Sequence, residues 1–210
     1  MSNIVIRYMA LGMASANCYI VYLKDSKECI VVDAPGDTAR IIAELDRLEL
    51  KPAAVLLTHS HFDHIGAALE LCEHYGVKLC CHEAEAELLK EPGLNLTSMV
   101  GRGYGLSAER TFYDGEELEL AGMKLRVIHT PGHTAGGACY YFYEEGVLIS
   151  GDTLFAESVG RTDFPTGSSR VLMDSIKNKL FTLPEDTVVY PGHYESTTIG
   201  HEKQYNRYLR

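Results

Sequence analysis

Apolar positions along the chain follow two spacings in turn. Short runs rich in β-branched and aromatic residues, bounded by Gly, Pro or Asp, predict strands. These runs cover residues 3–10, 17–23, 28–33, 53–58, 77–81, 116–120, 124–130, 137–143, 147–150 and 187–190. Apolar residues spaced by three or four predict helices. The helices are expected at about 39–48, 64–75, 83–90, 168–180 and 198–208. Asp37 is a suitable N-cap for the first of them. Such alternation favours layered α/β packing.

The segment 91–107 breaks this pattern because it has no clear periodicity and contains four glycines. We expect a surface segment, with Met99, Arg102 and Tyr104 lining a pocket as a lid. The competing interpretation is an ordinary Gly-rich surface loop.

Composition narrows the class of protein further. The chain has 210 residues, of which 46% are hydrophobic, so we expect a single domain spanning 1–210 with a core that needs no disulfides. The formal net charge of −10 argues against nucleic-acid and anionic-membrane partners, because both would be repelled. No apolar run reaches the ~18 residues of a membrane span. The composition is compatible with small-molecule substrates.

The six cysteines form no Cys-x-x-Cys pair, and the first residues lack the apolar region of a signal peptide. We therefore expect reduced thiols and a cytoplasmic protein. Cys80 and Cys81 are neighbours on a predicted strand and should point to opposite faces as buried small hydrophobes.

Candidate chemistry is concentrated in residues 58–64, Thr-His-Ser-His-Phe-Asp-His, directly after an apolar strand. Three imidazoles and a carboxylate crowded into one turn are costly unless a cation compensates them. The competing interpretation is a polar turn with Asp63 as N-cap, but three histidines add nothing to a cap.

Three later strands each end in a turn with one strong ligand preceded by glycine. The turns end in Gly132-His133, Gly151-Asp152 and Gly192-His193. Glycine permits a close approach of the backbone, and ligands at the ends of separate strands can converge at one edge of a layered fold.

Together the two sets supply five imidazoles and two carboxylates, from His59, His61, Asp63, His64, His133, Asp152 and His193. That is more than one four-coordinate ion needs and suits two ions with open positions. We expect two divalent metal ions, with zinc as the first choice and iron or manganese also compatible with the ligand types.

These residues resemble the metallo-β-lactamase superfamily, whose His-x-His-x-Asp-His motif matches residues 59–64 and is followed in order by the three later ligands. The resemblance covers nearly the whole chain and implies an αββα four-layer sandwich, with the metals at one edge of its two sheets. It also implies the roles. Metal one would be held by His59, His61 and His133, metal two by Asp63, His64 and His193, and Asp152 would bridge them.

Within the superfamily, the segments 151–155 and 160–164 are most similar to the glyoxalase II and persulfide dioxygenase branches, which act on glutathione-linked substrates. Two departures stand out. Only 17 residues, 194–210, follow His193, the last of these ligands, where long glyoxalase II enzymes have a helical domain. Their lysine-aromatic-tyrosine pattern is replaced by Arg161-Thr162-Asp163, which retains a basic residue but puts glutathione recognition in question.

The first functional hypothesis is hydrolysis of a thioester or ester, possibly glutathione-linked in the manner of hydroxyacylglutathione. In this hypothesis a metal-bound hydroxide attacks the carbonyl, and Asp63 and Asp152 are the catalytic carboxylates. The alternative is a mononuclear iron dioxygenase acting on a glutathione persulfide, because two histidines and a carboxylate suit that chemistry. A third possibility is a non-catalytic metal-binding protein. β-Lactamase activity is disfavoured by the lack of an export signal.

Two further residues carry a hypothesis of their own. Arg161 is expected to bind a substrate carboxylate, unless it forms a salt bridge with Asp163 instead. Asp33, at a strand end, is expected either to orient a ligand histidine or simply to begin a turn. The other histidines, His74, His82, His129 and His201, are interpreted as structural.

Overall fold

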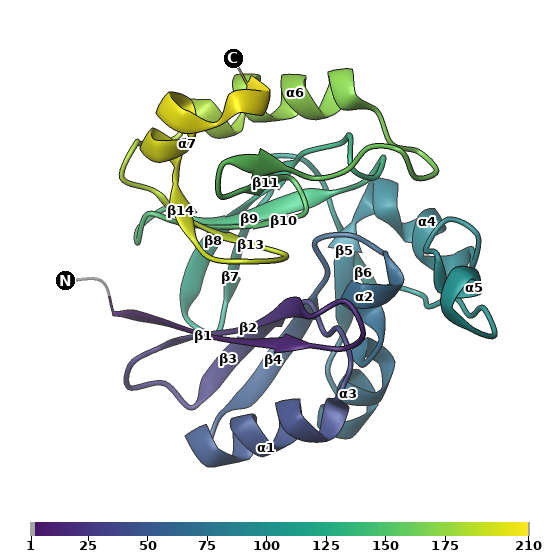
Figure 1. Cartoon of the computed structure of the whole chain (residues 1–210). Coiled ribbons are helices and arrows are strands. Elements are labelled where there is room, and N and C mark those ends of the chain that lie inside the picture. Colours follow the sequence, from purple (N-terminus) through teal and green to yellow (C-terminus); the bar gives the residue numbers. More distant parts are fainter. Residues whose placement is uncertain (1–2, 210) are drawn as a thin grey trace.

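The computed structural model describes residues 3–209, and most of its strands belong to two six-stranded sheets that lie face to face (Figure 1). In the first sheet, the strands follow sequence order. They are β1 (Ile4–Leu11), β2 (Ala16–Leu23), β3 (Glu28–Val32), β4 (Lys51–Leu56), β5 (Leu79–His82) and β6 (Arg110–Phe112). The first two pairings are antiparallel and the remaining three are parallel.

The second sheet has the order β14-β13-β10-β9-β8-β7. Its strands are β7 (Glu117–Leu120), β8 (Met123–His129), β9 (Ala138–Phe142), β10 (Val147–Gly151), β13 (Val188–Pro191) and β14 (Thr197–Thr198). Only β10 and β13 pair in parallel. A small hairpin of β11 (Leu154–Phe155) and β12 (Ser158–Val159) follows β10.

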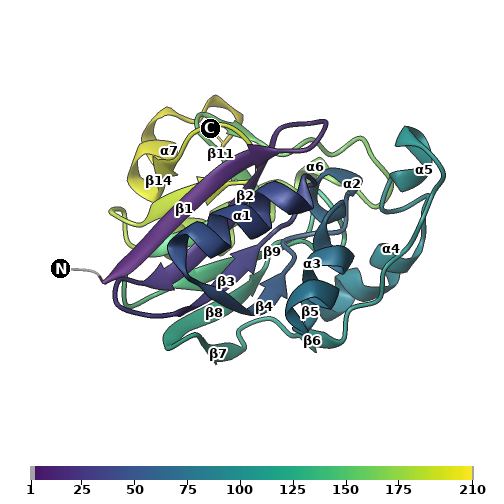
Figure 2. The same ribbon diagram turned by 90° about the horizontal axis from the view of Figure 1, so that it is seen from below.

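Helices cover the outer faces of both sheets. In Figure 1, α1 and α3 lie below the first sheet and α6 and α7 lie above the second, and Figure 2 shows α1 lying across the first sheet. The helices are α1 (Thr38–Leu48), α2 (Phe62–Ile65), α3 (Ala68–Tyr75), α4 (Ala86–Lys90), α5 (Thr97–Val100), α6 (Ser169–Asn178) and α7 (Ile199–Tyr205). Short 3₁₀ turns span Glu83–Glu85, Leu180–Thr182 and Arg207–Leu209.

Three layers of buried apolar side chains separate these four layers of secondary structure. Strand β2 shows how, because Ile20 packs toward α1 and α3, whereas Val21 packs between the two sheets. A third cluster joins Leu148 of β10 to Leu172 and Ile176 of α6. Burial on both faces explains why the central strands read as continuous apolar runs. The αββα sandwich expected from the sequence is confirmed.

The helix predicted at 64–75 is interrupted, so that α2 and α3 are separate. The segment after β3 causes the break. Ala34 donates its backbone N–H to the His64 carbonyl and accepts one from Ala67. A Cβ on Gly66 would lie 2.3 Å from the Pro35 carbonyl oxygen. Hydrogen bonds to a distant segment replace those of a continuous helix.

Several local expectations are corrected or confirmed. Strands β6, β11, β12 and β14 were not predicted, and the segment 91–107 contains the short helix α5. Asp37 occupies the N-cap position of α1, but its side chain accepts no hydrogen bond from that helix.

Cys80 and Cys81 do point to opposite faces, into different apolar clusters. All six cysteines are buried and free. Among residues 3–209, no helix combines the length and apolar character of a membrane span.

Candidate metal centre

The seven predicted ligands all lie just beyond the ends of strands. His59, His61, Asp63 and His64 follow β4, and the last two of these belong to α2. The other three residues follow strands of the second sheet, with His133 after β8, Asp152 after β10 and His193 after β13. Residues that are 134 positions apart in sequence thus meet at one edge of the sandwich.

The glycines before the later ligands allow this convergence. A Cβ on Gly132 would lie 2.3 Å from the backbone nitrogen of Leu172 in α6, and one on Gly192 would lie 2.1 Å from Asp152 Oδ1. A Cβ on Gly151 would lie 2.5 Å from Thr58. These distances are far below van der Waals contact, so only glycine fits the close approach that the sequence pattern predicted.

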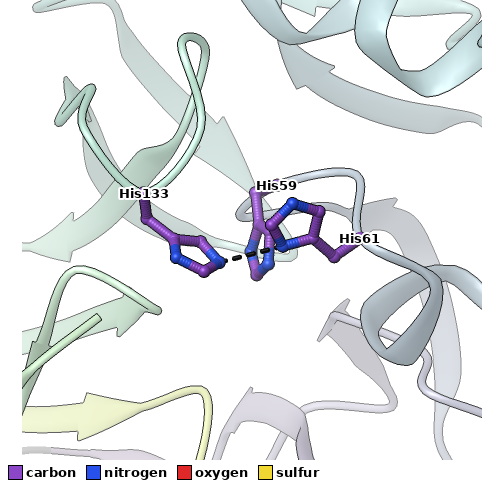
Figure 3. A group of neighbouring side chains, drawn as sticks. All are labelled: His59, His61 and His133. Atoms are coloured by element: carbon purple, nitrogen blue, oxygen red, sulfur yellow. Dashed lines mark hydrogen bonds between the residues drawn. The ribbon is translucent and has the colours of Figure 1, made fainter. Parts of the chain in front are cut away.

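The first group of possible ligands is His59, His61 and His133, each contributing a nitrogen within 4.8 Å of the others. Their rings are nearly perpendicular, with centroids 4.6 to 4.8 Å apart. Figure 3 shows the three rings converging on one point, with His61 Nδ1 and His133 Nε2 2.9 Å apart. Three nitrogens directed at a common point form the arrangement that a tetrahedral ion with one open position requires.

The second group is Asp63, His64 and His193, which also fall within 4.8 Å of one another. The Nε2 atom of His193 lies 3.4 Å from Asp63 Oδ2, and that of His64 lies 4.0 Å from the same oxygen. Two imidazoles and one carboxylate therefore surround a second point beside the first.

Asp152 lies between the two groups. Its Oδ2 is 3.5 Å from His133 Nε2 in the first group and 3.7 Å from His193 Nε2 in the second. Its Oδ1 is 3.5 Å from His64 Nε2. One carboxylate is thus within reach of both points, which is the position that a bridging ligand needs.

Several buried polar atoms in this cluster have no hydrogen-bond partner among the described residues. They include His59 Nε2 in the first group, His64 Nε2 in the second and Asp152 Oδ1 between them. Unpaired buried polar atoms are rare in folded proteins because each costs about 1–3 kcal/mol. Divalent cations would pair with nitrogens and oxygens of this kind, so the donor set fits the metal ions expected from the sequence.

The electrostatics of the cluster point the same way. Burial, followed by the neighbouring His133, lowers the pKa of His61 to about 2, and burial lowers the pKa of His59 strongly as well. Both rings are therefore neutral and able to bind metal. Burial also acts to lower the pKa of His64, but the carboxylates of Asp33, Asp152 and Asp63 outweigh it and raise that pKa to about 10. The carboxylates thus attract a positive charge to this position.

Asp33 contacts His64 of the second group on the side of the ring that faces away from the site. Its Oδ2 is 2.8 Å from His64 Nδ1 and accepts a hydrogen bond from the Thr58 hydroxyl, while its Oδ1 accepts one from the Thr58 backbone N–H. The contact with Nδ1 leaves Nε2 of His64 directed into the site. Of the two interpretations of Asp33, the structure favours the orienting one.

Glu85 plays a comparable part behind the first group, and the sequence did not reveal it. Its buried carboxylate accepts hydrogen bonds from the backbone and hydroxyl of Ser60, at 2.8 and 2.5 Å, and from the Thr134 hydroxyl at 2.8 Å. Ser60 separates His59 from His61, and Thr134 follows His133. Glu85 therefore joins the two loops that carry the first group. Glu83 and Glu87 flank it with the same side chain, so no periodicity distinguished it.

A cleft of about 520 Å³ opens above the predicted ligands. Its walls include Arg161, but the guanidinium donates two 2.7 Å hydrogen bonds to Asp163 and lies 3.9 Å from the ring centroid of Phe164. The salt bridge considered from the sequence is therefore present. Phe155, Phe164 and Tyr194 also line the cleft, and the sequence offered no signal for these aromatic walls beyond their proximity to predicted ligands.

Of the three residues of the segment 91–107 that were expected to line a pocket, Tyr104 does so and two do not. Leu96 lines the cleft, and Tyr104 lines a second hollow beside it. Met99 and Arg102 line neither hollow, although both are exposed. His82 and His129 stack on each other with ring centroids 4.1 Å apart, and neither belongs to a group of possible metal ligands among the described residues.

This fold and donor set belong to a known class. Residues 11–193 match the model of the metallo-β-lactamase superfamily, and the chain is a member of that superfamily. It is 36% identical over 200 residues to hydroxyacylglutathione hydrolase GloC of Haemophilus influenzae, with 92% of each chain covered.

Two solved structures are similar over nearly the whole chain. The BLEG-1 B3 metallo-β-lactamase superposes with a TM-score of 0.93 at 39% identity, covering 98% of this chain and 99% of that one. TTHA1623 in a di-iron-bound form superposes with a TM-score of 0.84 at 32% identity, covering 97% and 100%.

Proposed function

We propose that this protein is a metal-dependent hydrolase that uses two divalent ions to cleave a thioester or ester. The observation that carries the proposal is the pair of three-residue groups with Asp152 between them. The similarity to GloC supports a substrate of the hydroxyacylglutathione type.

The chain's own residues have distinct parts in this proposal. His59, His61 and His133 hold one ion, Asp63, His64 and His193 hold the other, and Asp152 is shared. Once bound, such ions lower the pKa of a water molecule and polarise a carbonyl. Asp63 and Asp152 contribute two negative charges against four positive ones, so the centre favours an anionic transition state. Asp33 and Glu85 position the loops and do not touch the substrate.

Zinc is our first choice of metal, because three imidazoles with an open position are typical of catalytic zinc. Iron is the strongest rival, since TTHA1623 has been solved with two irons. A second candidate function follows from iron, namely oxygen-dependent oxidation of a persulfide by a mononuclear centre.

The thiol arm of the substrate is proposed to carry a carboxylate that lies near Arg161, in the manner of glutathione. Arg161 is exposed and keeps part of its guanidinium free while it binds Asp163. We also propose a single domain over 1–210 and a cytoplasmic location, which the buried free cysteines support.

The test combines metal analysis with turnover. Protein loaded with zinc should contain nearly two ions per chain and hydrolyse a glutathione thioester equally with and without oxygen. Asp152→Ala should lose turnover and bind less metal, whereas Asp174→Ala, an exposed carboxylate on α6, should retain both.

Three outcomes would contradict the proposal. An Asp152→Ala variant with unchanged metal content and activity would remove the assigned site. Oxygen consumption with one iron per chain would favour the dioxygenase. Turnover of a β-lactam but no thioester would place this protein with BLEG-1 in activity as well as in fold.

A further inference from the structure

The cleft above the predicted ligands is called the metal cleft below. A second hollow of about 500 Å³ lies beside it and shares Phe62 and Asp63 with it. Its other walls come from the turn between β1 and β2, the segment after β3, and the region of α5. Since Asp63 belongs to both hollows, a molecule whose reactive group lies at the predicted metals can extend into either one.

The walls of this hollow, which we call the apolar groove, are Met13, Phe62, Val100 and Tyr104 over a floor that includes Pro35 and Gly36. Met13 is 82% exposed, Val100 42% and Tyr104 40%. These residues are three of the ten exposed large apolar side chains among the described residues. Exposed apolar side chains gathered at one place indicate a binding surface rather than scattered surface residues.

Hydrogen bonds hold these walls in place. The hydroxyl of buried Thr97 accepts a hydrogen bond from the Tyr104 N–H and donates one to the Tyr104 carbonyl, and the amide of buried Asn95 donates to the same carbonyl. On the opposite side, the Asp37 carboxylate accepts a hydrogen bond from the N–H of Gly12, next to Met13. A groove whose walls are already ordered loses little entropy when a ligand binds.

The charges of the two hollows differ. Arg161 lines the metal cleft, whereas the charged residues among 3–209 that line the apolar groove are Asp37 and Asp63. Asp63 is a predicted ligand. The Asp37 carboxylate already accepts a hydrogen bond from the Gly12 N–H and forms an ion pair with Arg40. The groove therefore suits a neutral apolar group, while an anionic group is better placed on the Arg161 side.

We propose that the apolar groove binds the acyl chain of the substrate, and that the substrate class is a thioester with an apolar acyl group of several carbons. This inference rests on the proposed function and deepens it. The carboxylate-bearing thiol arm lies toward Arg161, the carbonyl lies at the metals, and the acyl chain extends past Phe62 toward Met13, Val100 and Tyr104.

The first experiment measures binding without turnover. Octanoate and acetate are titrated calorimetrically into the zinc-loaded protein, because both present the same carboxylate to the metals and differ only in the chain. Each buried methylene strengthens binding up to about fourfold, so octanoate should bind at least about tenfold more tightly. The methyl group of Met13 should shift in the NMR spectrum with octanoate, and that of buried Met123 should not.

A matched pair of variants locates the effect. Val100→Asn removes apolar surface from the groove without adding charge and should reduce the octanoate-to-acetate affinity ratio by about threefold or more. Leu69→Asn makes the same kind of change at an exposed residue of α3 outside the groove and should leave the ratio unchanged. Equal affinities for octanoate and acetate, or equal affinity ratios in the two variants, would contradict the proposal that the apolar groove binds the acyl chain.

The second experiment measures hydrolysis of acetyl and octanoyl thioesters of N-acetylcysteamine. The octanoyl ester should have the higher kcat/KM by about tenfold, and Val100→Asn should reduce that preference. Turnover of both esters without preference would overturn the groove and leave the hydrolase proposal intact. Tighter binding of octanoate without turnover of either thioester would contradict the hydrolase proposal and leave the apolar groove as a binding site. A preference for octyl thioacetate instead would overturn the assignment of the acyl chain.

Discussion

At the scale of single residues, Glu85 is a buried group that connects two loops of the site. It accepts hydrogen bonds from Ser60 and Thr134 in two different loops, and burial raises the pKa of its carboxyl even though these bonds lower it. Removing a buried acceptor leaves its donors unsatisfied, which costs more than the net value of the bonds.

We therefore predict that Glu85→Ala lowers the free energy of unfolding by about 2–4 kcal/mol, because it leaves donors unpaired and a cavity. It should also weaken zinc binding, since His61 and His133 lose their common support. Glu85→Gln retains an acceptor and should recover most of both. Urea denaturation and competitive zinc titration measure the two effects.

The matched control is Glu87→Ala, which removes an exposed carboxylate that pairs with Lys90. Exposed pairs contribute about 0–1 kcal/mol, so this variant should resemble the wild type. If Glu85→Ala and Glu87→Ala behave alike, Glu85 has no positioning role.

At the scale of elements, the turn between β8 and His133 depends on how closely it approaches α6. Gly132 has a φ of 134°, and a Cβ there would overlap with Leu172 near the start of that helix. Ser168, the N-cap of α6, also donates its backbone N–H to the Gly132 carbonyl. The helix thus holds the loop from outside the second sheet.

Gly132→Ala should therefore destabilise the protein by about 2 kcal/mol or more and displace His133, with loss of zinc affinity. Gly146→Ala is the matched comparison, because Gly146 also has a positive φ, of 66°, but no atom lies within 4 Å of its added Cβ. That variant should show only the cost of a side chain in the left-handed region, about 1 kcal/mol, with normal zinc affinity. Equal effects on zinc binding in the two variants would refute the link between α6 and His133.

At the scale of the whole molecule, the predicted centre joins both sheets. His59 to His64 come from the first sheet and His133, Asp152 and His193 from the second, so bound ions would link the two halves of the sandwich. A ligand that binds only the folded state stabilises it by mass action.

We predict a marked rise in Tm with zinc. At a free zinc concentration of about 1,000 times the Kd, one site adds about 4 kcal/mol, which corresponds to roughly 8–16 °C for a protein of this size. Differential scanning calorimetry across a zinc series, with a chelator at the low end, measures this. Magnesium, which prefers oxygen ligands, should have little effect, and Asp152→Ala should respond less to zinc. An unchanged Tm with zinc bound would contradict the proposed coupling.

Much of this protein could be predicted from local sequence. The apolar runs of β2, β3 and β10 and the helical spacing of α1 and α6 predicted these elements because their burial repeats along the chain itself. The seven predicted ligands stood out for another local reason, because so many imidazoles at strand ends have few other uses. The superfamily and its four-layer fold followed from that motif.

Other features were decided only by the tertiary structure. Glu85 and Asp33 act through partners 25 to 49 residues away, the break between α2 and α3 comes from hydrogen bonds to Ala34, and the apolar groove forms where three separate segments meet. Each depends on contacts between distant parts of the chain, and such contacts leave no periodic signal in the sequence.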